Sequence, residues 1–359
     1  RAMTATSSPP APRPERERGG SRPGPLAGLA LLALVGLALG FFLRGGGEGA
    51  GPVVSVYTAH GQDALDVLVP RFERQTGIRV ELVKLGSGEV IQRVQAEQAA
   101  PRCDVIWSIG GDQLAANASL LESFRPPEVW SSLAPAYREA VGDSPWLPYT
   151  VILPVLLVNT KLLPPAKRPQ GWADLRREDF AGKLSAARAD KSGSAFLQIV
   201  TVLRLKGEAP GWALIDEILA RAVLSGSSSA VPRFVNDGEA LVGLTLEDSA
   251  QRYVRGGGPV EIVYPVEGTS AAPDGMALVK GAPHRAAAEA FIAWALSQET
   301  QAFLVKTLGR RSVRPDVAPP PGLPPLAEIK AQAHDFAWAA ERKAAIVARW
   351  RKRVSELGK

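Results

Sequence analysis

The feature that most restricts the fold of this chain is a regular order of short strands and helices. Residues 53–57 (VVSVY) and 104–108 (DVIWS) are rich in β-branched and aromatic side chains, which predicts buried strands. Residues 63–75, which lie between them, carry apolar side chains at helical spacing. Strands that alternate with helices predict an α/β fold with a parallel sheet and helices on both of its faces.

The same order continues along most of the chain. Further strands are expected at residues 78–85, 182–187, 240–245, 260–264 and 273–280, and further helices at 89–98, from Gly193 onward, and at 212–223, 247–256, 285–296 and 299–308. Residues 145–160 interrupt this order with an extended apolar run that holds three prolines. Such a run is typical of a strand that crosses between two lobes. We therefore expect a first lobe of residues 53–148 with 266–317, and a second lobe of residues 149–265.

The uncharged run from Pro23 to Leu43 indicates where this body acts. As a helix, its 21 residues would be about 30 Å long, which matches the hydrocarbon core of a bilayer. Arginines in the preceding tail keep the N-terminus in the cytoplasm by the positive-inside rule, and they are Arg13, Arg16, Arg18 and Arg22. The chain after Leu43 is therefore predicted to be exported.

Three segments precede the body. Residues 1–24 are rich in Pro, Arg and Gly and are expected to form a disordered basic tail. Residues 25–43 are either an uncleaved transmembrane anchor or a signal peptide that is cleaved near residues 38–40. Residues 44–52 (RGGGEGAGP) predict a flexible linker. The body is thus expected outside the cytoplasm, either tethered to the membrane or secreted after cleavage.

The charge and the cysteine content exclude several classes of function. The net charge of +6 comes from the two ends, because residues 1–24 have a surplus of three basic side chains and residues 326–359 a surplus of four. The body between them is close to neutral, which argues against a nucleic-acid partner. One cysteine, Cys103, excludes an intramolecular disulfide and a cysteine-based metal cluster, and three histidines leave little room for a multi-histidine metal site. We expect neither a metal nor a cofactor.

The C-terminal end is predicted to be a separate helical segment. Residues 315–325 hold six prolines, and residues 318–325 are expected to be a Pro-rich linker. Residues 326–357 predict one long basic helix with Trp338 and Trp350 on its apolar side. We expect this helix, within the C-terminal segment 326–359, to pack on the first lobe rather than to contact anionic lipid.

Two helix starts are the main candidate binding site. Ligands of open α/β sheets bind outside the carboxyl ends of the strands. Ser87-Gly88 and Ser192-Gly193-Ser194 follow predicted strands, and small residues there expose backbone amides and hydroxyls at the positive end of a helix dipole. Lys191 adds a full charge. Each motif alone is equally explained by N-capping, but one in each lobe predicts an anion-binding cleft.

Other loops supply secondary candidates. Tyr57, Thr58 and His60 follow the first strand, and Glu247-Asp248 start a helix, where they either recognise a hydroxyl or amine or simply complement the helix dipole. His60 is the one candidate general base, but no positioned nucleophile or second acid accompanies it. The chain contains no GxSxG, HExxH, GxxxxGK[ST] or strand-linked GxGxxG motif. We therefore expect no catalytic residues and no enzyme activity.

Eight segments together carry a resemblance to a known family. They read VSVYTAHGQDALDVLVPRFERQTGIRVELV (54–83), GSGEVIQRVQAE (86–97), DVIWS (104–108), LPYTVILPVLLVNTKLL (147–163), GWADL (171–175), KSGSA (191–195), VGLTLEDSAQRYV (242–254) and VEIVYPVEGTSAAPDGMALVKGAPH (260–284). The chain resembles the solute-binding proteins of bacterial ABC importers, which have the type 2 periplasmic-binding-protein fold. It is most similar to the ferric-iron, phosphonate and sugar-phosphate branch.

This resemblance implies two lobes that close around a ligand at a hinge. The chain would cross near Tyr149–Asn159 and return near Tyr264–Glu267. Ser87, Gly88, Ser192, Gly193 and Ser194 match the hydroxyl-and-amide cradle of the family, and Tyr57, Thr58 and His60 match the loop that faces its cleft. Iron-binding members use a pair of adjacent tyrosines, whereas this chain has Glu247-Asp248 at the matching stretch and a lone Tyr253 beyond it.

The resemblance implies a transport function. The expected role is capture of a small anion, such as a phosphonate, a phosphate ester or a sugar phosphate, and its delivery to an ABC permease by a monomeric protein in the periplasm. Three alternatives stay open. The first is Fe(III) capture through Tyr57, Tyr253 and a synergistic anion. The second is an exported enzyme with His60 as base, and the third is a membrane-anchored sensory domain on the same fold.

Overall fold

The computed structural model describes residues 51–359. The expected tail (1–24), the apolar helix (25–43) and residues 44–50 of the expected linker lie outside the described residues. Within residues 51–359, no helix has both the length and the apolar character that a membrane crossing requires.

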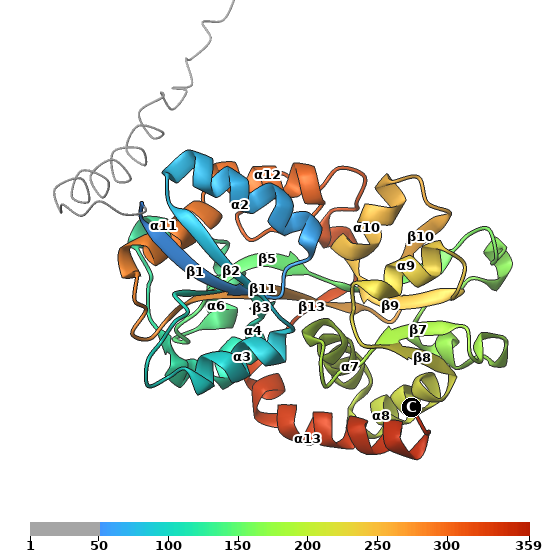
Figure 1. The fold of residues 1–359 in the computed structure, drawn as a ribbon. Coiled ribbons are helices and arrows are strands. Elements are labelled where there is room, and N and C mark those ends of the chain that lie inside the picture. The colour runs from blue at the N-terminus through green and yellow to red at the C-terminus, as the bar shows by residue number, and fades with distance from the viewer. Residues whose placement is uncertain (1–50) are drawn as a thin grey trace, which may run out of the picture. The chain divides into compact units, whose positions relative to one another are not determined.

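The described chain forms two sheets, each with helices on both faces (Figure 1). The eight-stranded sheet has the order β12 (Arg311–Ser312), β5 (Leu147–Ile152), β11 (Thr269–Val279), β3 (Val105–Gly110), β1 (Val53–Thr58) and β2 (Arg79–Lys84), and β4 (Leu121–Glu122) and β13 (Ala331–Ala333) also pair with β11. We call this sheet and the helices packed on it the first lobe. One face carries α2 (Gln62–Thr76), α5 (Pro127–Ser131), α11 (Arg285–Ala295) and α12 (Gln298–Leu308), and the other carries α3 (Ser87–Ala96), α4 (Gly111–Ala116) and α6 (Pro135–Val141).

The five-stranded sheet and its helices form the second lobe. Its order is β10 (Val260–Val263), β6 (Pro154–Asn159), β9 (Val242–Leu246), β7 (Leu184–Ala187) and β8 (Ala222–Ser225). One face carries α7 (Gly193–Lys206), α8 (Glu208–Arg221) and α13 (Phe336–Glu356), and the other carries α9 (Ala230–Asn236) and α10 (Glu247–Arg255). Short 3-10 helices lie at η1 (Ala118–Leu120), η2 (Pro165–Lys167), η3 (Trp172–Arg176), η4 (Glu178–Phe180) and η5 (Leu326–Glu328).

The two-lobe α/β fold is confirmed, but the expectation of purely parallel sheets is wrong. β1 runs parallel to β2 and β3, whereas β11 is antiparallel to both β3 and β5. In the second sheet, β6 is antiparallel to both β9 and β10. These antiparallel strands are the ones through which the chain passes between lobes, and they enter their sheets without the long helical crossover that a parallel neighbour needs.

The chain crosses between the lobes where the apolar, proline-rich run is found. Leu153, which is fully buried, separates β5 in the first sheet from β6 in the second. The return passes from β10 to β11 through residues 264–268. The expected boundary between residues 148 and 149 therefore falls inside β5, because β5 pairs with β11 as far as Ile152.

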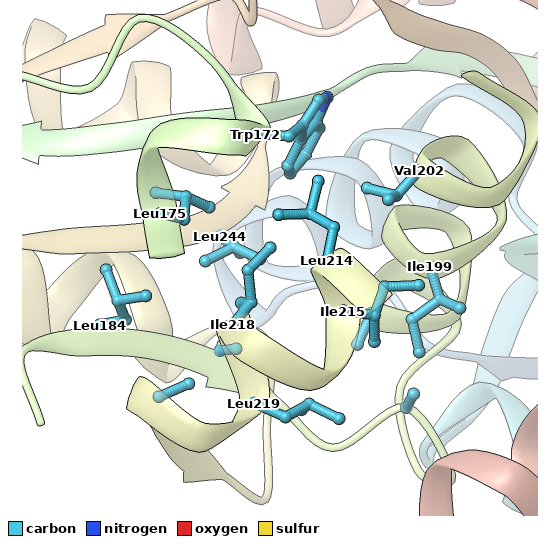
Figure 2. Close-up of a cluster of buried hydrophobic side chains, with 14 of the residues drawn as sticks. Trp172, Leu175, Leu184, Ile199, Val202, Leu214, Ile215, Ile218, Leu219 and Leu244 are labelled. Atoms are coloured by element: carbon cyan, nitrogen blue, oxygen red, sulfur yellow. The ribbon is translucent and has the colours of Figure 1, made fainter. Parts of the chain in front are cut away.

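The second lobe has a large apolar core. Figure 2 shows side chains from η3, β7, β9, α7 and α8 converging on one volume, including Trp172, Leu184, Ile218 and Leu244. Each fully buried side chain of this size contributes about 1.5–3 kcal/mol through removal of apolar surface from water. This core holds α7, whose first turn faces the other lobe.

The C-terminal segment differs from its prediction in two ways. Helix α13 begins at Phe336, ten residues after the expected start, because Ala331–Ala333 pair with β11 and Asp335 caps the helix. Its apolar face packs mainly on the second lobe rather than on the first. Ala339, Ile346, Trp350 and Val354 join the second-lobe core, and Phe336 alone joins a first-lobe cluster.

Candidate functional site

A cavity of about 820 Å³ lies between the two lobes. The first lobe contributes residues that follow β1, β2 and β3, and the second contributes the start of α7, the start of α10 and residues 226–229. Serines, glycines and charged residues make up much of the wall. The cavity therefore lies where the strand-to-helix junctions of both sheets meet.

The first turn of α7 presents unpaired backbone donors to this cavity. Ser192 is the N-cap, and its Oγ accepts a hydrogen bond from Ala195 N at 3.3 Å. The first intrahelical bond runs from Phe196 N to Ser192 O at 3.0 Å, so the amides of Gly193 and Ser194 precede it. The helix dipole places partial positive charge here, and the exposed Lys191 stands directly before the cap.

The first turn of α3 lies against that of α7. A Cβ on Gly193 would lie 3.2 Å from Oγ of Ser87, and one on Gly86 would lie 3.3 Å from the carbonyl oxygen of Lys191. Gly86 N donates to Oε2 of Glu89 at 2.8 Å, which leaves the amides of Ser87 and Gly88 as the donors of this turn. Two helix starts from different lobes are thus in near contact, and glycine permits the close approach.

Arg310 holds a buried charge network at another part of the cavity wall. Its Nε donates to Oδ2 of Asp248 at 2.8 Å, and its Nη1 donates to Oδ2 of Asp274 at 3.2 Å and to Oγ1 of Thr150 at 3.1 Å. Burial opposes the charged form of Arg310, but Asp248 and Asp274 outweigh it and raise the Arg310 pKa. The Arg310–Asp248 pair joins the first lobe to the second.

Ser108 has a strained backbone beside this network. Its φ is 54°, the one positive φ of a non-glycine residue in the described chain. Its Oγ donates to Oδ2 of Asp274 at 2.6 Å, which fixes the conformation. Strain of this kind costs about 1–3 kcal/mol and is retained mainly at functional sites.

His60 lines the cavity as a neutral, buried imidazole. Its ring is edge-on to Trp107, with ring centroids 4.6 Å apart, and its Nε2 lies 3.4 Å from the hydroxyl of Tyr149. Burial lowers the pKa of His60 well below its usual value, and the charge of Arg310 lowers it further. His60 can therefore offer one donor and one acceptor, but no positive charge.

The charges of the wall are mostly paired. Asp63 pairs with Arg252 at 3.0 Å, and Asp112 pairs with Lys343 of α13 at 3.1 Å. Among the residues that the structure describes, Lys84 and Lys191 are the basic side chains of the wall that form no ion pair. Glu89, at the start of α3, also lines the cavity without an ion pair within residues 51–359, so the unpaired side chains near the two helix starts are two lysines and one glutamate.

Comparison with known proteins places this fold in a family. Residues 54–307 match the family described as bacterial extracellular solute-binding protein. The chain belongs to this family. A Serratia marcescens relative named Fe(3+)-binding periplasmic protein is 25% identical over 302 residues, which cover 81% of this chain and 87% of the relative. A Salmonella typhimurium relative, named as a 2-aminoethylphosphonate-binding periplasmic protein, is 27% identical over 307 residues that cover 82% of this chain and 87% of the relative.

Solved structures of solute-binding proteins share the fold. The periplasmic binding protein AfuA of Actinobacillus pleuropneumoniae, with fructose-6-phosphate bound, matches with a TM-score of 0.80 at 22% identity, over 85% of this chain and 99% of that chain. Iron-bound HitA of Pseudomonas aeruginosa matches with a TM-score of 0.74 at 21% identity, over 86% of this chain and 100% of that chain. The resemblance that the sequence predicted is confirmed.

The structure of this solute-binding protein brings most of the predicted site residues together. His60, Ser87, Lys191, Ser192, Gly193, Ser194 and Asp248 all line the cavity. Gly88 lies in the first turn of α3 but is not one of the residues that line the cavity.

The side chains of three predicted site residues form hydrogen bonds or ion pairs within the protein, away from the cavity. The hydroxyl of Tyr57 donates to Glu97 at 2.9 Å, because alternate residues of a strand face opposite sides of the sheet. Thr58 Oγ1 donates to the carbonyl oxygen of Trp107 at 2.7 Å and accepts from His60 N at 3.0 Å, so it shapes the turn that positions His60. Glu247 is 2% exposed and pairs with Arg311 at 2.7 Å. These three side chains do not face the cavity.

Several wall residues were missed by the sequence reasoning. Arg310, Asp274 and Ser108 form the buried network, and Asp112 and His334 add a second polar area. The adjacent pair Arg310-Arg311 was a usable signal, because two arginines stand together in a body with almost no net charge. Asp274 and Ser108 carried no such signal, since their roles depend on the pairing of β11 with β3.

Proposed function

We propose that this protein is the extracytoplasmic solute-binding component of an ABC importer and that it captures a small organic anion between its lobes. The anion carries a phosphonate, phosphate-ester or sugar-phosphate group. The observation that carries the proposal is the pair of helix starts, α3 at Ser87 and α7 at Gly193, which meet at the cavity beside Lys191. Two helix N-termini and a free ammonium group are a strong combination for an anion.

The size of the cavity favours an organic anion over inorganic phosphate. About 820 Å³ lies in the range of sites for small organic ligands. The wall away from the helix starts offers Asp248, Ser108 and His60. Oδ1 of Asp248 is buried and has no hydrogen-bond partner among the described residues, so it can accept a hydrogen bond from the organic part of a ligand.

The Fe(III) alternative has less support from these residues. Burial and the neighbouring Glu97 raise the pKa of Tyr57 to about 12, and its hydroxyl lies against Glu97 rather than in the cavity. Tyr253 is also outside the cavity wall. Among residues 51–359, no cluster of three or more His, Cys, Asp or Glu side chains is placed to hold a metal ion. Neither tyrosine of the Fe(III) alternative therefore stands in the cavity wall of this chain.

The proposed function needs no chemical reaction. Ligand binding would favour the conformation in which the two helix starts meet, because only that conformation supplies both sets of donors. The relatives and structures compared above are binding proteins. His60 is buried and neutral, and its ring contacts Trp107 and Tyr149, which suits a ligand contact rather than a general base.

The proposed partners follow from the family. A relative in Sinorhizobium fredii, 25% identical over 253 residues, is named as an ABC transporter periplasmic-binding protein. We expect this chain to deliver its solute to a membrane permease, as a monomer, from the outer side of the cytoplasmic membrane. Residues 25–43 would either tether it there or be removed as a signal peptide.

Isothermal titration calorimetry with the purified residues 51–359 tests the proposal. The ligands are inorganic phosphate, methyl phosphate, 2-aminoethylphosphonate, fructose 6-phosphate and Fe(III) citrate. We expect binding of at least one phosphorus-containing organic anion and weaker or no binding of Fe(III). Silence for every phosphorus compound would overturn the anion proposal, and a visible charge-transfer band with iron would support the alternative.

A further inference from the structure

The C-terminal segment returns to the wall of the cavity. Strand β13 pairs in parallel with the start of β11, with Ala331 opposite Thr269 and Ala333 opposite Ala271. The chain then enters the cavity wall, where both His334 and Phe336 line the space. Neither side chain belongs to the helix starts or to the Arg310 network.

His334 has an unused hydrogen-bonding atom in this position. The residue is 6% exposed, and its Nδ1 is buried without a hydrogen-bond partner in the described part of the chain. Most buried polar atoms in folded proteins have a partner, and one without a partner raises the free energy of the folded state. Because His334 lines the cavity, a ligand that displaces a small part of the wall can supply the missing partner.

The residues around His334 hold its imidazole ring in place but give its Nδ1 no hydrogen bond. Its ring is edge-on to Phe336 at 4.7 Å between centroids, and Phe336 in turn packs edge-on to Trp146 at 5.1 Å. The next residue, Asp335, caps α13 by accepting from Trp338 N at 3.0 Å and pairs with Arg204 of α7 at 3.4 Å. His334 is therefore positioned from both lobes.

The local charges determine which ligand group suits this position. Burial lowers the pKa of His334, Asp112 and Asp335 oppose that change, and Arg204 adds to it, so the ring is neutral at neutral pH. Asp112 is 4% exposed, and Lys343 already neutralises it. A phosphate dianion here would meet the carboxylate of Asp112 without a free cation. A hydroxyl group suits a neutral imidazole in either tautomer, because it can both donate and accept.

We infer that His334 is a ligand-contacting residue whose Nδ1 forms a hydrogen bond with a hydroxyl group in the organic part of the captured anion. This inference rests on the proposed function, and it narrows the solute to hydroxylated phosphate esters. The anionic group binds at the starts of α3 and α7, and the C-terminal segment recognises the hydroxylated part. Ligand selection is thereby divided between the two lobes and the segment that follows them.

The test compares His334→Phe and His334→Gln with the unchanged protein, each as the full chain. Calorimetry measures binding of methyl phosphate, which has no hydroxyl on its organic part, and of fructose 6-phosphate. The unchanged protein should bind fructose 6-phosphate more tightly than methyl phosphate. His334→Phe should weaken fructose 6-phosphate binding about 10-fold to 100-fold and leave methyl phosphate unchanged, since a lost hydrogen bond in a desolvated site has an effect of this size. His334→Gln, which keeps a donor and an acceptor, should recover part of the loss.

Other results overturn the inference in distinguishable ways. If His334→Phe weakens the binding of both ligands equally, His334 shapes the cavity wall but does not recognise the hydroxyl group. If the affinity for both ligands is unchanged, His334 does not contact the ligand. Equal affinity of the unchanged protein for both ligands would reject the hydroxylated class while leaving anion capture intact. Binding of neither ligand would reject this inference, and the proposed function would fall with it only if inorganic phosphate and 2-aminoethylphosphonate also failed to bind. In histidine-selective ¹⁵N spectra, the His334 Nδ1 signal of the unchanged protein should move on addition of fructose 6-phosphate.

Discussion

Lys343 in α13 lies with its Nζ 3.1 Å from Oδ2 of Asp112, at the start of α4 in the first lobe. The same ammonium group stands 5.1 Å from the ring centre of Phe196 in α7 of the second lobe. One side chain from the C-terminal helix thus touches both lobes beside the cavity. Asp112 is almost completely buried, so Lys343 is the cation that makes its burial tolerable.

Lys343→Met should therefore destabilise the protein. It leaves Asp112 charged and buried without its partner, and we expect a loss of about 1–3 kcal/mol in the free energy of unfolding. Urea denaturation measures this loss. Combining Lys343→Met with Asp112→Asn should recover much of it, because the double variant has no buried charge. A double variant that is as unstable as the sum of the two single variants would show that the pair is not coupled.

Lys352 supplies a control on the same helix. It is 79% exposed on its side chain and lies 4.0 Å from Glu356. Lys352→Met should change the free energy of unfolding by less than about 0.5 kcal/mol, because exposed pairs contribute little. A loss equal to that of Lys343→Met would mean that α13 is sensitive to any lysine removal.

Ser192→Asp should abolish or strongly weaken anion binding. Aspartate is a good N-cap, so α7 should still form, but a carboxylate would stand where the anion is expected. We expect at least about a ten-fold rise in Kd, since one repelling charge in a closed cleft changes binding by 1.4 kcal/mol or more. Calorimetry with the best phosphorus-containing ligand measures the change.

Ser297→Asp is the matched control for that experiment. Ser297 caps α12 in the same way, since its Oγ accepts from Thr300 N at 3.2 Å, but it does not line the cavity. Its Kd should equal that of the unchanged protein. If Ser192→Asp also binds normally while both variants stay folded, the α7 start is not the anion site.

Two glycines at helix starts should respond in opposite ways to alanine. A Cβ on Gly111 would lie 2.5 Å from Trp146 and 2.6 Å from Phe336, so Gly111→Ala should cost about 1–3 kcal/mol through overpacking. Gly88 has nothing within 4 Å of its Cβ position, and Gly88→Ala should stabilise α3 by about 0.5–1 kcal/mol. Thermal unfolding distinguishes the two.

Ligand binding provides a second readout for the same pair. Gly88→Ala should keep its affinity, because the backbone amide remains and the Cβ lies in open space. Weaker binding of Gly88→Ala would mean that this position lies nearer to the ligand than the cavity wall indicates.

His60 should make the protein less stable in mild acid. Its folded pKa is lowered by burial and by Arg310, with Tyr149 as the other titratable neighbour, so the unfolded chain binds a proton that the folded chain does not. This contribution is fully present above pH 6.5 and is lost as the pH falls from 6.5 toward the folded pKa. The slope can reach about 1.4 kcal/mol per pH unit for one histidine.

Urea denaturation between pH 7.5 and 5 checks this expectation. His334 has a lowered pKa for the same main reason and adds to the slope. His60→Gln should reduce the pH dependence of the free energy of unfolding by the share of one proton taken up on unfolding. The double variant with His334→Gln should reduce it by the share of two protons. A slope that is unchanged in His60→Gln would show that His60 is protonated equally in both states.

The sequence predicted the architecture better than the site. The periodicities of β1, α2 and β3 were local signals, and the proline-rich run between residues 145 and 160 marked the crossing correctly. The helix starts at Ser87 and Ser192 were visible because small hydroxylated residues before a helix have a local physical meaning. Both line the cavity in the structure.

The features that the sequence did not predict depend on contacts between residues that are distant in the sequence. The side-chain direction of Tyr57 follows from which face of β1 is covered by α3. Glu247 is held away from the cavity by its ion pair with Arg311, which lies 64 positions later in the sequence. The start of α13 was misplaced because Ala331–Ala333 read as helical but pair with β11. Such outcomes arise from tertiary pairing, which local propensity does not contain.

The packing of α13 also affects how the chain folds. The core of the second lobe combines residues from β6 to β9 with Ala339, Ile346, Trp350 and Val354, which come almost a hundred positions after β9. During synthesis, that core stays incomplete until α13 has emerged. The second lobe therefore depends on contacts of high sequence separation, which form slowly and leave apolar surface exposed in the meantime. A truncation before Phe336 would remove the last part of this core as well as part of the wall of the binding cavity.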